Sequence, residues 1–150
     1  MKINPAVTLA AAICLAGHSL AIAAGPEPDM KGTWRGRTYT IVAGRGSHWP
    51  TNTGTFDQPG LLERDLLIEI TGQEDRRFWG VATVSGSGET TREPFVGGLT
   101  GADDLDVVIA DTDGYFHGHI SGDAFSFCYA QAGGHAGATA VSCGEVTHTR

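Results

Sequence analysis

The sequence of 150 residues has few cysteines, few basic side chains and no apolar run long enough to cross a bilayer, which takes about 20 residues. Lys and Arg total 10 against 17 Asp and Glu, so the formal net charge at pH 7 is −7. Because a surface of this sign repels phosphate groups, we expect neither nucleic acid nor an anionic membrane as a partner. No window has the sustained three-to-four spacing of apolar residues that is typical of a helix, so no helix is predicted.

The first residues have the features of a secretory signal peptide. Lys2 supplies a positive charge, residues 7–22 are largely apolar, and Ala21-Ile22-Ala23 is a small-x-small cleavage sequence. The apolar stretch is short and is interrupted at residues 17–19, so we expect no membrane span. The chain is therefore predicted to be secreted or periplasmic.

Three segments follow from this interpretation. We expect a cleaved signal peptide over residues 1–24, a polar leader over residues 25–32 and one barrel domain over residues 33–150. Loss of Lys2 with the signal peptide changes the formal net charge from −7 to −8.

Cysteine usage agrees with export. Cys14 lies in the signal peptide and is removed with it, which leaves Cys128 and Cys143. An even pair in an exported chain indicates a disulfide bond. In the chain-entropy model, closing a loop this short contributes about 3 kcal/mol of stability.

Short stretches of alternating apolar and polar residues predict eight β-strands. They cover residues 33–43, 65–71, 77–84, 94–100, 105–110, 115–121, 125–131 and 140–147. The predicted fold class is all-β, and the predicted architecture is a single eight-stranded antiparallel up-and-down barrel, whose closure removes both sheet edges. Residues 44–64 lack periodicity and are predicted to be a functional lid or a mobile segment.

Turn chemistry predicts the pairing of the strands. Gly122-Asp123 suits a two-residue hairpin turn that pairs Ile120 with Phe125. A two-residue turn at Asp113-Gly114 would pair Ile109 with Gly118.

Two further hairpins predict the same inward face. A three-residue loop at residues 101–103 would pair Leu99 with Leu105, and opposed cysteines would set Phe127 against Gly144. Because a one-residue slip would reverse every side chain, this agreement between hairpins favours the assignment. The apolar residues predicted to face inward are Leu66, Ile68, Ile70, Phe78, Val84, Phe95, Leu99, Leu105, Val107, Ile109, Phe116, Ile120, Phe125 and Phe127.

The polar groups expected inside the barrel are the hydroxyls of Thr38, Thr40, Tyr129 and Ser142. No carboxylate or histidine is expected to join them, which would leave no acid–base pair in the interior. We therefore predict no catalytic residues, no cofactor and no enzymatic activity.

His117-Gly118-His119 is the best metal candidate, because residues two apart share one face of a strand. The predicted register turns both histidines outward, and no third ligand is identifiable, whereas zinc takes three or four protein ligands. No metal site is expected.

Aromatic-x-Gly units begin at Trp34, Phe78, Phe95 and Phe116. The ring and the glycine of each unit lie on the same side of a strand. Such a glycine leaves room for a ring from the neighbouring strand, or it lets the strand bend.

Gly32-Thr33-Trp34 at the start of the first strand, followed by a long first connection, resembles the calycin barrels, which include lipocalins and avidins. The resemblance implies an eight-stranded meander, with a large loop at the cavity mouth as in lipocalins. In lipocalins an arginine near the chain end packs across this tryptophan, and Arg150 is the candidate here. Arg35 and Gly36 follow Trp34, so the Asn and Ser with which avidins contact biotin have no counterpart, and biotin binding is not expected.

The predicted function is binding of a small, mainly apolar ligand inside the barrel, with Trp34, Thr38, Trp49 and Tyr129 as ligand-binding residues. Two alternatives stay open: a protein-recognition or inhibitor module that acts through its loops, and a structural envelope protein. The identity of the ligand and the oligomeric state also stay open.

Overall fold

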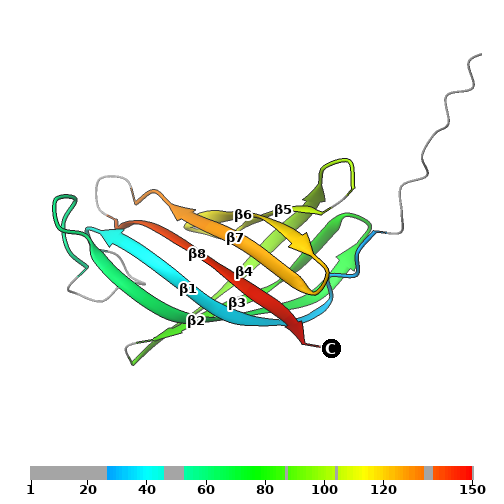
Figure 1. Ribbon diagram of the computed structural model, residues 1–150, viewed down its shortest axis with the longest axis horizontal. Helices are drawn as coiled ribbons and strands as arrows, with labels where there is room; N and C mark the ends of the chain where they lie inside the picture. The colour runs from blue at the N-terminus through cyan, green and yellow to red at the C-terminus, as the bar shows by residue number, and fades with distance from the viewer. Residues whose placement is uncertain (1–26, 46–52, 87, 104, 134–136, 150) are drawn as a thin grey trace, which may run out of the picture.

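The computed structural model describes residues 27–45, 53–86, 88–103, 105–133 and 137–149, and it has one closed barrel of antiparallel strands (Figure 1). Each strand pairs with the next along the chain, and the last pairs with the first. The strands are β1 (Gly32–Ala43), β2 (Gly60–Glu74), β3 (Arg77–Gly86), β4 (Glu89–Thr100), β5 (Asp106–Ala110), β6 (Gly114–Ser121), β7 (Ala124–Gln131) and β8 (Thr139–Thr149). The predicted fold class and architecture are confirmed. Within the described ranges, no helix is long and apolar enough to cross a membrane.

The alternating pattern places the predicted apolar set inside the barrel. All of these residues belong to the main core cluster; most are buried, and Val84 and Leu105 are partly buried against the others. Met30, Trp34 and Val146 are also buried in this cluster. Removal of these side chains from water is the main stabilising contribution to a small barrel of this kind.

The predicted registers are confirmed where β7 pairs with its neighbours. Ile120 lies opposite Phe125, and Phe127 lies opposite Gly144. Cys128 and Cys143 also lie opposite each other and form the predicted disulfide bond on the outer face of the barrel.

The predicted pairing of β4 with β5 is wrong by two residues. Leu99 lies opposite Val107 instead of Leu105. The connection is longer than expected, because Leu105 turns back into the loop, where its N–H donates to Asp103 Oδ1 at 3.3 Å. Its carbonyl accepts a hydrogen bond from Ile120 at 2.8 Å.

The predicted pairing of β5 with β6 is also wrong by two residues, since Ile109 lies opposite Phe116. The cause is an Asx turn: Asp111 Oδ1 accepts hydrogen bonds from the N–H groups of Asp113 at 2.9 Å and Gly114 at 2.7 Å. A shift of two residues preserves the face of every side chain, so the inward set is unaffected.

The first connection is shorter than the predicted segment of residues 44–64, because β2 begins at Gly60. The extension pairs with the end of β1. Leu62 packs there against Val42, Ala138 and Ala140 in a second small core cluster at the start of β8. The described part of the connection is tied to the barrel by a hydrogen bond of 2.9 Å from the Gly60 N–H to the Thr53 carbonyl.

The glycines of the aromatic-x-Gly units lie at close approaches between strands. A methyl group on Gly97 would meet the ring of Phe78, and one on Gly118 would meet the ring of Phe125 and the backbone of β7. At Gly36 and Gly80 the obstacle would be the backbone of a neighbouring strand. The expectation that the glycine leaves room for a ring is therefore confirmed at Gly97 and Gly118, whereas Gly36 and Gly80 admit the backbone of a neighbouring strand.

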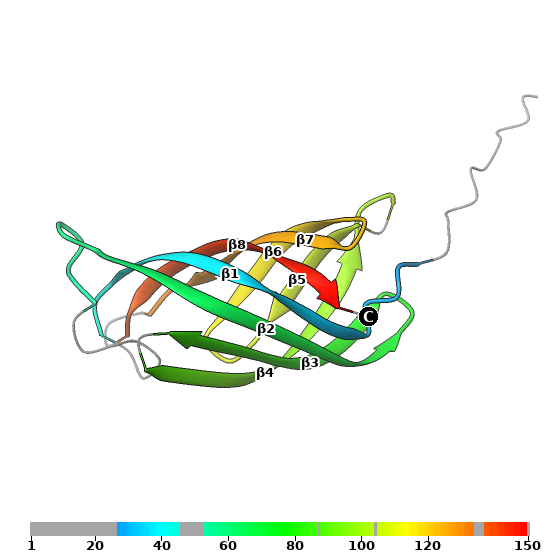
Figure 2. The ribbon, with the colours of Figure 1, turned by 60° about the horizontal axis from the view of Figure 1, so that its bottom comes forward.

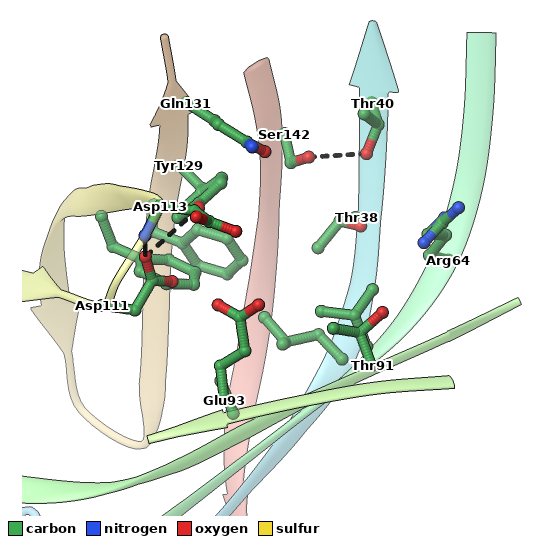
Figure 3. Close-up of a pocket in the computed structure, with 15 residues that line it drawn as sticks. Thr38, Thr40, Arg64, Thr91, Glu93, Asp111, Asp113, Tyr129, Gln131 and Ser142 are labelled. Atoms are coloured by element: carbon green, nitrogen blue, oxygen red, sulfur yellow. Dashed lines mark hydrogen bonds between the residues drawn. The ribbon is translucent and has the colours of Figure 1, made fainter. Parts of the chain in front are cut away.

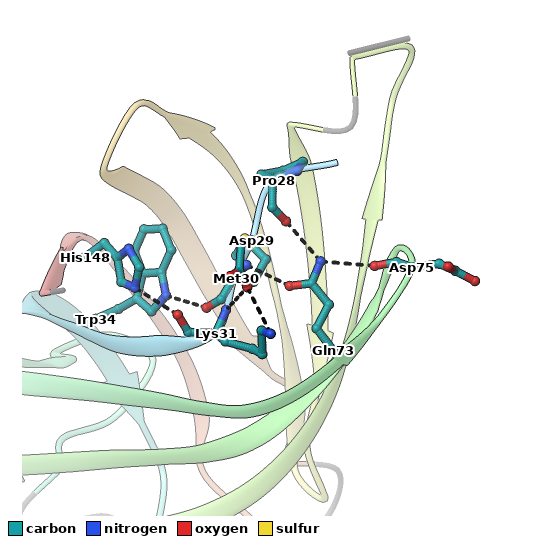
Figure 4. A network of polar contacts seen from close by, with 8 residues as sticks. All are labelled: Pro28, Asp29, Met30, Lys31, Trp34, Gln73, Asp75 and His148. Atoms are coloured by element: carbon teal, nitrogen blue, oxygen red, sulfur yellow. Dashed lines mark hydrogen bonds and ion pairs between the residues drawn. The ribbon is translucent and has the colours of Figure 1, made fainter. Parts of the chain in front are cut away.

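The leader closes the end of the barrel at which β1 begins and β8 ends (Figure 2). Met30 is 1% exposed, and its N–H donates to Gln73 Oε1 at 2.7 Å (Figure 4). Gln73 Nε2 in turn donates to the Pro28 carbonyl at 2.9 Å, and Trp34 Nε1 donates to the Met30 carbonyl at 3.0 Å. The chain before β1 is thus held in place across this end, which we call the plugged end of the barrel.

The indole of Trp34 is covered by His148. The two rings stack with centroids 4.6 Å apart and an interplanar angle of 18°, and His148 Nε2 donates to the Lys31 carbonyl at 3.0 Å. His148 thus packs across the tryptophan, as the resemblance to lipocalins implied for Arg150. Arg150 lies outside the described residues, as do the predicted signal peptide and Trp49.

Candidate functional site

A pocket lies at the opposite end of the barrel, which we call the mouth, inside the ends of the strands (Figure 3). Its cavity volume is about 70 Å³, enough for several waters or a small organic group but not for a large lipid. The lining comes from all parts of the chain: Thr38, Thr40, Arg64, Leu66, Ala82, Val84, Thr91, Glu93, Asp111, Asp113, Phe116, Phe127, Tyr129, Gln131 and Ser142.

The deeper lining of the pocket is apolar and belongs to the core. Phe116 and Phe127 have ring centroids 5.4 Å apart, and Phe116 also contacts the Tyr129 ring at 4.7 Å. Leu66 and Ala82 are buried on β2 and β3. These side chains provide a surface for an apolar group of a ligand.

Hydroxyl groups line β1 and β8. Thr40 Oγ1 and Ser142 Oγ share a buried hydrogen bond of 2.7 Å. Thr38 is 3% exposed and projects into the pocket, and its hydroxyl has no hydrogen-bond partner among the described residues. The Thr38 hydroxyl can therefore form a hydrogen bond with a ligand or water atom in the pocket.

Carboxylates also line the pocket, which corrects the expectation that none faces inward. Glu93 lies on β4, and Asp111 and Asp113 lie at the β5–β6 turn. Asp111 Oδ1 accepts a hydrogen bond of 3.3 Å from the Tyr129 hydroxyl in addition to those from its two backbone donors. The pocket is therefore apolar inside with an acidic side, rather than apolar with a few hydroxyls.

The environment of Tyr129 stabilises its neutral form. Burial raises the pKa of the phenol most, and the negative charges of Asp111, Glu93 and Asp113 raise it further, as does the hydrogen bond to Asp111. Tyr129 therefore acts as a hydrogen-bond donor and not as a base.

Tyr129 is expected to remain protonated up to the onset of alkaline unfolding. The folded-state pKa of Tyr129 lies above the ordinary value of 10.0. The contribution of the protonated phenol to the free energy of unfolding is therefore fully present below pH 10 and is lost as the pH rises further. The stability advantage of the wild type over Tyr129→Phe should therefore narrow above pH 10. Absorbance at 295 nm should show the same number of phenolates forming in the wild type and in Tyr129→Phe at pH values below alkaline unfolding. An additional phenolate step in the wild type over this range would contradict the assignment.

Arg64 lines the wall of the pocket on β2. Its side chain is 3% exposed, and Nη2 lies 3.9 Å from Glu89 Oε2. Burial lowers the pKa of the guanidinium, and Glu89 partly opposes this effect. In a closed ring of eight strands β2 and β6 are diametrically opposed, so Arg64 faces the acidic side from across the pocket (Figure 3).

The sequence-predicted ligand residues separate into two places. Thr38 and Tyr129 both line the pocket, as predicted from their inward position. Trp34 lies at the plugged end, where it is 3% exposed and bound to the leader, and it lines a second pocket there with Met30 and His148. Trp49 is not among the residues that the structure describes.

Sequence reasoning missed Arg64, Glu93 and Asp111, although a signal was present. Each continues the two-residue period of an inward set by one step beyond the predicted strand end: Arg64 before Leu66, for example. Treating these positions as turn or loop residues removed them from the predicted interior.

The two candidate metal ligands face away from the pocket. His117 and His119 are exposed on the outer face of β6, and His119 Nδ1 lies 2.9 Å from Asp106 Oδ1. Among the described ranges there is no group of three or more His, Cys, Asp and Glu side chains placed to hold a metal ion.

The fold and the mouth pocket define a class, a small closed up-and-down barrel with a pocket at its mouth, which is compatible with a calycin-like fold. Comparisons with protein families, with curated proteins and with solved structures found no match to this chain. The chemistry of the pocket is therefore the basis on which a function can be proposed.

Proposed function

We propose that this protein binds a small molecule in the mouth pocket and does not act as an enzyme. The observation that carries the proposal is the Thr38 side chain: its hydroxyl has no partner among the described residues and lies at the wall of a cavity that continues into an apolar floor. An apolar pocket with a few convergent polar groups is the usual form of a small-molecule site.

The non-enzymatic part of the proposal is supported by the state of the inward acid–base groups. Asp111 Oδ1 already accepts three hydrogen bonds, and Tyr129 holds its proton strongly. Neither Cys128 nor Cys143 is available as a nucleophile, because they are bonded to each other. Among the described residues that line the pocket there is no histidine.

Binding can be tested with 3-phenylpropan-1-ol, a neutral probe with a ring for the floor and a hydroxyl for the Thr38 wall. Titration followed by amide chemical shifts is expected to perturb Thr38, Tyr129 and Ser142 saturably. Thr91→Trp should block this response, because Thr91 lines the pocket, whereas Thr90→Trp on the same strand should not, because Thr90 is exposed. Absence of saturable shifts in folded wild-type protein, or equal shifts in both variants, would refute pocket binding.

We further propose that the chain is exported, a proposal supported by the Cys128–Cys143 bond, since disulfides persist mainly in oxidising compartments. Intact-mass measurement of protein from its native host is expected to give a chain that begins near Ala24 with no free thiol. A chain that retains Met1, or that has two reactive thiols, contradicts export.

Protein recognition is a second candidate function, favoured by exposed apolar side chains on the outer face. Val141, Ile41 and Leu61 are adjacent across β8, β1 and β2, and they are 42%, 46% and 78% exposed. Tyr39 extends this apolar row along β1. A row of this kind suits a protein surface better than water. Leu61→Ser should leave probe binding in the pocket unchanged.

A further inference from the structure

We propose that the ligand of the mouth pocket is a small amine that is positively charged at neutral pH and carries an apolar ring or chain. This inference rests on the proposed function and adds the charge of the ligand to it. The cationic group would lie at the acidic side of the pocket, formed by Glu93, Asp111 and Asp113, and the apolar part would lie on the floor.

The first argument is the balance of charge inside the mouth. Three carboxylates line the pocket against one guanidinium, that of Arg64, which has Glu89 as a neighbour. The carboxylates lie on one side of the pocket: Asp111 and Asp113 belong to the turn beside Tyr129, and Glu93 projects toward them from β4 (Figure 3). A cation placed there would meet a negative potential, and in a partly buried site such a potential is screened less than at an open surface.

The second argument is independent of the acids and comes from Thr38. The Thr38 side chain is largely buried at the pocket wall, and its hydroxyl has no hydrogen-bond partner in the described part of the chain. The hydroxyl is therefore available to accept a hydrogen bond from a group bound in the pocket. An ammonium group is a donor of three hydrogen bonds, so one small ligand can reach both a carboxylate and a hydroxyl acceptor.

The apolar floor distinguishes an organic amine from an inorganic cation. A metal ion needs several oxygen or nitrogen ligands in one shell, and the described residues offer no such group. Phe116, Phe127 and Leu66 instead provide ring and aliphatic contacts next to the acids. An amine with an apolar body uses both surfaces at once.

The charge of the whole chain acts in the same direction. A formal net charge of −7 attracts cations and repels anions before contact, which raises the association rate of a cationic ligand. Because this long-range effect does not depend on the pocket, the test must separate it from the local contacts.

The experiment compares three probes of one skeleton by calorimetric titration: 3-phenylpropylamine, 3-phenylpropan-1-ol and 3-phenylpropionate. We expect the amine to bind about tenfold more tightly than the alcohol, and the acid to bind most weakly. Equal or tighter binding of the alcohol or the acid would overturn the inference while leaving pocket binding intact. If no probe binds the folded protein, the proposed function itself fails.

Matched variants separate the pocket acids from the net charge. Glu93→Gln should reduce amine affinity about tenfold and leave alcohol affinity unchanged, because Glu93 lines the pocket. Glu145→Gln removes the same formal charge from the exposed outer face of β8, where Glu145 accepts from Ser126, and should change neither affinity by more than about twofold. An equal loss of amine affinity in both variants would assign the preference to overall charge and overturn the site.

Discussion

Phe127→Ala is expected to lower the free energy of unfolding by about 3–5 kcal/mol, whereas His117→Ala should change it by less than about 0.5 kcal/mol. Phe127 is 5% exposed, and its ring lies 5.3 Å from that of Phe125 and 5.4 Å from that of Phe116. Truncation would leave a cavity in the centre of the barrel, next to the pocket. His117 is exposed on the outer face, so truncation of its side chain leaves the packing of the core unchanged.

Urea melts of the two variants, with the disulfide intact, make the comparison directly. Both positions lie in the same region of the sheet, since Phe127 pairs with Gly118 and His117 pairs with Cys128. Local differences between strands are therefore small, and the difference in stability between the two variants reports which side chain faces the interior of the barrel. A larger loss for His117→Ala than for Phe127→Ala would contradict the inward position of the ring.

The faces of the strands could be predicted from the sequence because they depend only on a period of two. Phe116, Ile120 and Phe125 were placed inward by local turn chemistry, and all three are buried. An error of two residues in register does not alter the face of a side chain. The all-β fold class and the disulfide also follow from local patterns and cysteine number.

The exact register of two hairpins could not be predicted from turn composition alone. Asp113-Gly114 is a frequent turn dipeptide, but the Asp111 carboxylate binds two backbone N–H groups and moves the turn to Thr112-Asp113. A side chain that competes for backbone donors can select one turn from several that the sequence allows.

The plugged end depends on contacts between residues far apart in the chain. Met30 donates to Gln73, 43 residues away, and Trp34 stacks on His148 at the other end of the sequence. Gln73 and His148 lie just beyond the ends of the predicted strands, and nothing local in the sequence indicates these contacts. The burial of the leader, and the position of Trp34 away from the pocket, follow from these contacts and not from any local pattern.

The acidic side of the pocket lies between these two cases. Glu93 and Asp111 continue the inward period of their strands, so their direction was available from the sequence. Their position inside a pocket could not be predicted, because the same carboxylates at an open barrel end would be ordinary surface groups. Closure of the barrel places them around Tyr129 and changes the expected ligand from mainly apolar to one with a charged end.

Gly36→Ala is expected to cost about 3 kcal/mol or more, or to prevent folding, while Gly98→Ala should cost less than about 0.5 kcal/mol. A methyl group on Gly36 would meet the backbone carbonyl of Glu145 and the Cα of Val146 on the adjacent strand, neither of which can move aside as a side chain can. A methyl group on Gly98 would lie 3.7 Å from the Arg76 carbonyl oxygen, an ordinary contact. Urea melts and far-ultraviolet circular dichroism of the two variants measure the difference. Since both lose the same conformational freedom in the unfolded chain, the difference isolates the contact between β1 and β8 that closes the barrel. Equal stability of the two variants would show that this closing contact tolerates a side chain, and that the glycine of the first aromatic-x-Gly unit is not required for closure.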